Sequence, residues 1–151
     1  RYANEFAQVA ADSLAAYRGR LLEVQRHHPH VPFAILYCFL HAIELGLKSF
    51  MLHTGSSLDD LMGRRGVGHD LGSALDLCVE RGLLECCPDL TEVLCDVIRL
   101  ASETYSEKGF EYIKIGPTQL PHVDQVAMAT RAILTGLGTL DMKPARVSGG
   151  E

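Results

Sequence analysis

The segment Pro32–His53 of this 151-residue chain reads PFAILYCFLHAIELGLKSFMLH, and it decides the fold. Residues 35–40 leave no polar side on a helix, so neighbouring elements must surround any helix that forms here. Pro32 suits the first turn of such a helix, where its missing backbone N–H costs no hydrogen bond. Gly55 lies just past the end and can adopt the left-handed conformation of a C-terminal cap. We therefore expect a buried central helix over residues 32–53.

Four other segments repeat apolar side chains at steps of three and four residues, which is the spacing of one helix face. They predict helices over residues 3–27, 69–82, 88–106 and 121–140. Asp70 is a natural N-cap for the second of these helices. The sequence thus predicts an all-α, up-and-down bundle of about five helices. Its length indicates a single domain, which we place at residues 1–142, with a flexible tail over residues 143–151.

Two connections between these helices carry patterns of their own. Residues 56–68 are rich in glycine, serine and charge, and within them Leu58, Leu61 and Met62 are expected to fold back onto the core as a short turn. Residues 110–115 alternate in a strand-like way. They are too short and isolated for a sheet, so we expect an extended loop or hairpin arm.

Composition excludes several classes of protein. With 47% hydrophobic and 22% charged residues, the chain is ordinary for a globular protein and unlike a disordered one. The net charge of −5 excludes the basic coat of many nucleic-acid binders, although it leaves room for a local basic site.

Five cysteines without a CxxC pair favour reduced thiols in a cytoplasmic protein. The central apolar segment is interrupted by charged residues, so we expect no membrane span.

Three polar residues, His41, Glu44 and Lys48, share one face of the central helix. Glu44 precedes Lys48 by four positions, which is the better orientation for an ion pair within a helix. Polar groups in so apolar a segment need a reason, because each costs free energy unless it is paired. Two interpretations stay open, namely a structural ion pair and the lining of a ligand groove.

A second group of candidate residues lies at the start of the following helix. The loop Gly66–Gly68, followed by His69 and Asp70, resembles an anion-binding nest that leads into a helix N-terminus. The lysine and the spacing of a P-loop are missing, and Asp70 as N-cap would occupy the same backbone donors. The loop histidines His27, His28 and His30 lack carboxylate or cysteine partners nearby, so we expect no metal site. We also expect no cofactor.

The order of two short motifs resembles the HEPN superfamily. The first motif is I-E-L-G-L-K at residues 43–48, and the second is G-H-D-L at residues 68–71. Tyr105 and the aromatic stretch 110–112 fall where many members carry a tyrosine and an aromatic-rich loop. The resemblance spans residues 6–140. It implies a helical bundle, usually a homodimer, that is associated with nucleotide or RNA binding and in some cases with a nucleotidyltransferase or an antitoxin partner.

The leading expectation is a non-catalytic HEPN-like binding module, within a toxin–antitoxin or defence system. It would engage a nucleotide, an RNA or a protein partner through polar residues of the two motifs. These residues are His41, Glu44, Lys48, His69 and Asp70.

The alternative is a metal-independent HEPN ribonuclease. The nuclease members carry an arginine and a histidine separated by four to six residues, and Arg64 with His69 is the match in this chain. Arg64 or Arg65 would bind the scissile phosphate, and His69 would act as general acid or base. The late helices hold no such motif, because neither Arg99 nor Arg131 is followed by a histidine at that distance.

Overall fold

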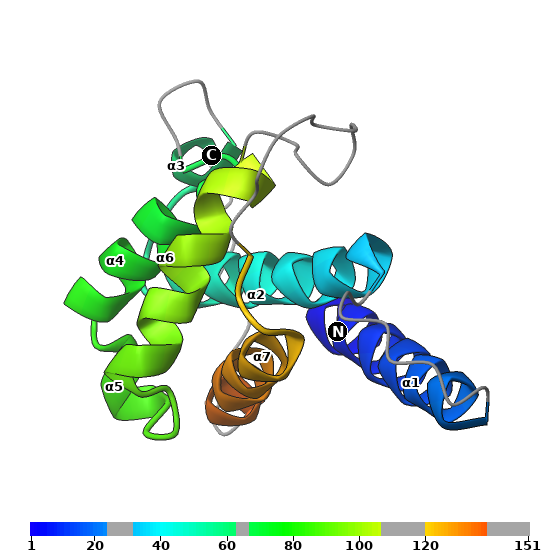
Figure 1. The fold of residues 1–151 in the computed structure, drawn as a ribbon. Helices are drawn as coiled ribbons and strands as arrows, with labels where there is room; N and C mark the ends of the chain where they lie inside the picture. Colours follow the sequence, from blue (N-terminus) through cyan, green and yellow to red (C-terminus); the bar gives the residue numbers. More distant parts are fainter. Residues whose placement is uncertain (24–31, 63–66, 107–119, 139–151) are drawn as a thin grey trace.

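The structure is a computed structural model that describes residues 1–23, 32–62, 67–106 and 120–138 (Figure 1). These ranges are all-α and contain no strand, which confirms the predicted fold class. They form seven helices: α1 (Tyr2–Glu23), α2 (Phe33–His53), α3 (Leu58–Met62), α4 (Leu71–Glu80), α5 (Leu83–Cys86), α6 (Glu92–Ser106) and α7 (Val123–Gly138). Two of our expectations, the extended loop at residues 110–115 and the tail at residues 143–151, lie outside the described residues.

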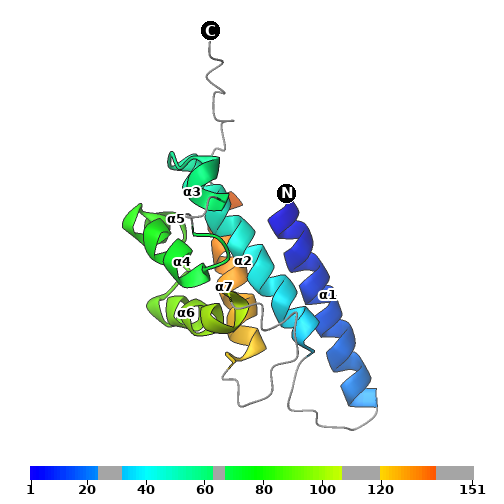
Figure 2. The same ribbon diagram turned by 90° about the horizontal axis from the view of Figure 1, so that it is seen from above.

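Helix α2 is the axis of the bundle, as its apolar sequence predicts. Helices α1 and α7 lie along it, while α4 and α6 cross it on another side (Figures 1 and 2). Its side chains Ile43, Leu47 and Met51 are completely buried. At Gly46 the helix comes close to α7, since a Cβ atom placed there would lie 3.1 Å from Cγ2 of Ile133. Burial of this one helix therefore organises the core.

Helices α4 and α6 pair in opposite directions. At one level the backbone N–H of Gly72 donates to the Ser102 hydroxyl over 2.9 Å. One turn further along α4, Arg99 of α6 donates two hydrogen bonds to the Asp76 carboxylate. Helix α4 begins at the Asp70 cap as predicted, because the Asp70 side chain accepts a hydrogen bond from the backbone N–H of Ser73 over 3.0 Å.

The boundaries of the later helices differ from our expectations. The short helix α5 was not predicted, and it follows Gly82, whose φ of +91° is accessible mainly to glycine. The helix expected from Pro88 begins only at Glu92, because the intervening backbone turns, with the N–H of Leu90 donating to the carbonyl of Cys87. Helix α3 matches the expected short turn.

Within α3, Leu61 is buried as expected, but Leu58 is 65% exposed, so its predicted contact with the core is wrong.

Helix α2 is long and apolar enough to cross a membrane by length and composition alone. Of the 18-residue stretch of α2 with the highest mean hydropathy, 61% is buried inside the structure, as in the core helix of a globular protein.

A substitution at Gly136 tests the packing of α7. A Cβ atom there would lie 2.6 Å from the carbonyl oxygen of Cys86 and 2.8 Å from Cα of Cys87, which is too close for any side chain. We expect Gly136→Ala to lower the free energy of unfolding by about 1–3 kcal/mol, measured by urea denaturation. The matched control is Gly19→Ala in α1, where no atom lies within 4 Å and alanine should stabilise the helix by about 0.5–1 kcal/mol. Equal unfolding midpoints for Gly136→Ala and the native protein would contradict this packing.

Candidate functional site

A buried carboxylate joins three parts of the bundle. Glu44 of α2 is only 3% exposed, and its two oxygens contact four polar side chains. Oε1 accepts a hydrogen bond from Lys48 Nζ over 2.6 Å and lies 3.0 Å from His69 Nδ1. Oε2 accepts from the Tyr105 hydroxyl over 2.5 Å and lies 3.3 Å from His41 Nδ1. We call these five residues the Glu44 cluster.

Helix periodicity and two chain turns bring these residues together. His41, Glu44 and Lys48 follow one another at steps of three and four, so they share one face of α2. His69 sits in the turn before α4, where Gly68 adopts a positive φ of +54°. Tyr105 lies in the last turn of α6 and is buried. The structure thus brings together four of the five residues expected to bind a ligand and adds Tyr105.

His41 is an internal member of the cluster, wedged between aromatic rings. The Phe6 ring meets it edge-on, with 4.5 Å between ring centroids, and the Tyr37 ring stacks on it at 5.8 Å. Its Nδ1 lies 2.9 Å from the Tyr105 hydroxyl. These contacts link α1 and α6 to the same face of α2 through His41.

Two opposing effects set the pKa of the Glu44 carboxyl. Burial raises it, but the hydrogen bonds from Lys48 and Tyr105 and the nearby charges of Lys48 and His69 outweigh burial, so the pKa lies below its ordinary value. Glu44 is therefore ionised at neutral pH. The Lys48 ammonium group, which is largely buried, balances its charge.

His69 is the member of the cluster that faces solvent, with 61% of its side chain exposed. An ionised carboxylate can only accept hydrogen bonds, so Nδ1 of His69 carries the hydrogen that points to Glu44. Among the described residues, no hydrogen bond engages Nε2, the other nitrogen of the ring. A carboxylate that fixes an imidazole in this way suits both anion binding and proton transfer.

Asp70 stands apart from the Glu44 cluster, although we expected it to share the ligand site. Its carboxylate accepts hydrogen bonds from the backbone N–H and hydroxyl of Ser73 and from the Ser102 hydroxyl. The hydrogen bonds from Ser73 are the main reason why the pKa of Asp70 lies below its ordinary value. Because the Ser73 N–H is already used, it is one donor fewer for an anion at this helix start.

The other candidates from the sequence are not among the described residues that form the Glu44 cluster. Arg64, Arg65 and the histidines His27, His28 and His30 lie outside the described residues. Among the residues that the structure does describe, no group of three or more His, Cys, Asp or Glu side chains could hold a metal ion. All five cysteines are described and have free thiols, and burial raises the pKa of Cys78 to about 12 and of Cys87 to about 11, so both are poor nucleophiles.

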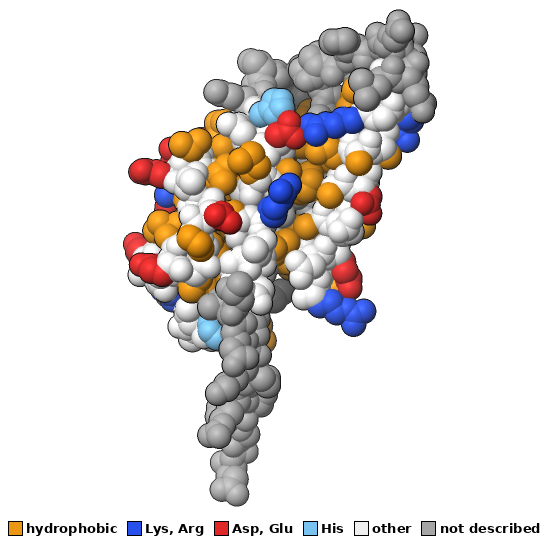
Figure 3. All heavy atoms as spheres, turned by 90° about the horizontal axis from the view of Figure 1, so that it is seen from below, with side chains coloured by type: hydrophobic (Ala, Val, Ile, Leu, Met, Phe, Trp, Pro, Cys, Tyr) orange, Lys and Arg blue, Asp and Glu red, His pale blue; other side chains and the backbone are white. Residues whose placement is uncertain are grey.

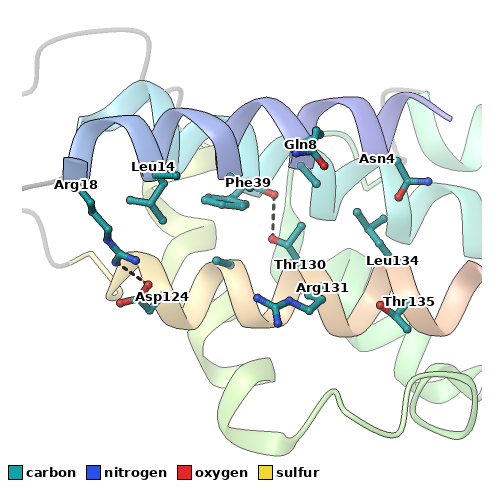
Figure 4. Close-up of a pocket in the computed structure, with 14 residues that line it drawn as sticks. Asn4, Gln8, Leu14, Arg18, Phe39, Asp124, Thr130, Arg131, Leu134 and Thr135 are labelled. Carbon is teal, nitrogen blue, oxygen red and sulfur yellow. Dashed lines mark hydrogen bonds and ion pairs between the residues drawn. The ribbon is translucent and has the colours of Figure 1, made fainter. Parts of the chain in front are cut away.

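A separate hollow lies between α1 and α7, with a volume of about 620 Å³ (Figure 4). It contains no residue of the Glu44 cluster. Comparison of the chain with protein-family models, with curated proteins and with solved structures found no match. The HEPN resemblance therefore stays a prediction.

Removing the Glu44 charge tests the cluster. Glu44→Gln leaves the Lys48 ammonium group buried without a counter-charge, so we expect the free energy of unfolding at pH 7 to fall by about 3 kcal/mol. The matched control is Glu5→Gln, which removes the exposed ion pair with Arg1 and should cost less than about 0.5 kcal/mol.

The same pair of variants has a defined pH dependence. Because its pKa in the folded state is lowered, Glu44 contributes stability above its unfolded pKa of about 4.3, and this contribution disappears as the pH falls through the folded pKa. The difference between native protein and Glu44→Gln should thus shrink as the pH falls below about pH 4. A difference that instead grows below about pH 4 would show that Glu44 is neutral in the folded state.

Proposed function

We propose that this chain is a HEPN-like helical module that binds the phosphate group of a nucleotide or an RNA end at the Glu44 cluster. The observation that supports it is the exposed His69 imidazole, whose Nδ1 is held 3.0 Å from a buried, ionised carboxylate. The ring is 61% exposed and its Nδ1 is directed to Glu44, so Nε2 is the nitrogen that remains to bind a phosphate. In its protonated form the ring donates from both nitrogens, to Glu44 on one side and to a phosphate oxygen on the other.

The electrostatics of the cluster favour such a ligand. Lys48 cancels the charge of Glu44, so the carboxylate does not repel a phosphate at His69. The Asp70 carboxylate is bound by Ser73 and Ser102. A long RNA would still meet a chain with a net charge of −5, whereas a nucleotide or a terminal phosphate needs only a local contact. A small phosphate ligand therefore fits better than an extended backbone.

The family resemblance supports further parts of this proposal. It favours a homodimer and a nucleotidyltransferase or an antitoxin as partner, in a toxin–antitoxin or defence system, while the five cysteines without a CxxC pair favour a cytoplasmic location. In such an arrangement the module would sense or deliver a phosphate group and leave the chemistry to its partner.

A metal-independent ribonuclease is the second candidate, and one observation favours it. A histidine fixed by a carboxylate through Nδ1, with Nε2 free, has the geometry of a general base. In this reaction Nε2 of His69 would take the proton of the RNA 2′-hydroxyl, and the 2′-oxygen would form a bond to the adjacent phosphorus. The bond from phosphorus to the 5′-oxygen would break, giving a 2′,3′-cyclic phosphate and a 5′-oxygen that takes a proton from water. Arg64 or Arg65, which lie outside the described residues, would stabilise the charge that develops there.

Nucleotide binding is tested by thermal unfolding of the native chain with mononucleotides and 5′-phosphorylated oligonucleotides. A ligand at about 100 times its Kd stabilises the folded state by about 2.7 kcal/mol, which is easily measured. We expect His69→Ala to weaken binding at least tenfold, because it removes the exposed donor. The matched control His122→Ala removes another exposed histidine, in front of α7, and should bind normally. If none of these ligands stabilises the native chain, the proposal is wrong.

The two candidate functions differ in the fate of RNA. We expect labelled RNA to stay intact when it is incubated with the native protein in EDTA. Cleavage that is lost in His69→Ala, with His122→Ala still active and all variants folded, would replace the binding module by the ribonuclease.

A further inference from the structure

The groove between α1 and α7 has an apolar floor. Leu14 of α1 and Phe39 of α2 form its base and Leu134 of α7 its side, and Figure 3 shows hydrophobic side chains gathered in a band along this face. Helices α1 and α7 contact each other much less than each contacts α2, so they stand apart above this floor. On the α1 side, Ala11 and Ala15 line the groove and are exposed.

The length of the groove matches that of a short helix. Its lining residues run from position 4 to position 18 of α1 and from position 124 to position 135 of α7. At 1.5 Å per residue these stretches are about 21 Å and about 17 Å long. A helix of about twelve residues has this length, whereas a compact small molecule would cover only a part of it. Recognition of a helix in a groove between two helices is a common mode of protein association.

The charged side chains along the groove differ in whether they have a partner of opposite charge. At one end Arg18 and Asp124 form an ion pair at 2.7 Å, so their charges cancel. Arg131 lines the groove further along α7 (Figure 4), and among the described residues no hydrogen bond or ion pair engages its guanidinium group. A guanidinium group that no described residue pairs with, next to an apolar floor, favours an acidic group on the occupant, because a guanidinium binds a carboxylate through two parallel hydrogen bonds.

We propose that the α1–α7 groove binds an amphipathic helix of a partner protein. The apolar face of that helix covers Leu14, Phe39 and Leu134, and an Asp or Glu side chain next to this face pairs with Arg131. This site shares no residue with the Glu44 cluster, so the proposal does not depend on phosphate binding at that cluster.

A peptide selection tests the proposal with the full chain. A library of random 16-residue peptides displayed on phage is selected on the native protein after depletion on Ala11→Arg, a variant whose new side chain fills the groove from an exposed position. We expect the enriched peptides to carry apolar residues at helical spacing together with an Asp or Glu. A synthetic representative, followed by fluorescence anisotropy, should bind at least tenfold more weakly to Arg131→Gln and to Ala11→Arg.

The controls separate charge pairing from general damage. Arg20→Gln removes an exposed arginine of α1 outside the groove lining and should leave binding unchanged. Arg131→Glu should bind the same peptide poorly and a peptide with Lys in place of its acidic residue well. Circular dichroism establishes that each variant is folded.

Three results would overturn the proposal. One is the absence of peptides that distinguish the native protein from Ala11→Arg. Another is a peptide whose binding does not change in Arg131→Gln. The third is light scattering that gives a dimer for the native chain and a monomer for Ala11→Arg, without peptide binding, which would assign the groove to a second copy of this chain.

Discussion

The ionised Glu44 carboxylate is the constraint to which the centre of this bundle is adjusted. Removed from water, it requires donors, and it takes them from its own helix, from the turn before α4 and from the end of α6. Each of these hydrogen bonds also fixes a segment of backbone. The donors of α4 and α6 reach this one carboxylate because both helices cross α2 at its level. A packing that buried the same apolar side chains but moved these donors away would leave the buried carboxylate without hydrogen bonds, which costs free energy.

The parts of the structure that could be predicted are those with a local signal. Phe33–His53 form a largely buried helix because residues 35–40 leave no polar side to face water, and Asp70 caps α4 because its side chain needs only the next three residues to do so. The face shared by Glu44 and Lys48 also follows from spacing along one helix. In each case the interacting groups lie within a few residues of one another.

The parts that could not be predicted depend on distant partners or on weak turns. Tyr105 lies 61 residues from Glu44, and its place in an apolar stripe explained its burial without indicating that its hydroxyl meets a carboxylate. The late start of α6 depends on a backbone turn after Cys87 that competes with the helix favoured by Pro88. No sequence pattern indicated the groove between α1 and α7, because the alanines that line it, such as Ala11 and Ala15, would equally suit close packing of the two helices.

The position of α1 has a consequence for motion. Among the described side chains of this helix only Ala10 and Leu14 are buried, and its contacts are mainly with α2, so its detachment as a unit would uncover few core side chains of its own. Segments of this kind open below the global unfolding free energy, and their amide protons exchange with solvent early. When α1 swings away, the Phe6 edge leaves the His41 ring, and water gains access to the aromatic wall behind the Glu44 carboxylate. Contact of Phe6 with His41 therefore lets α1 cover one side of the Glu44 cluster, while His69 keeps the other side in contact with solvent.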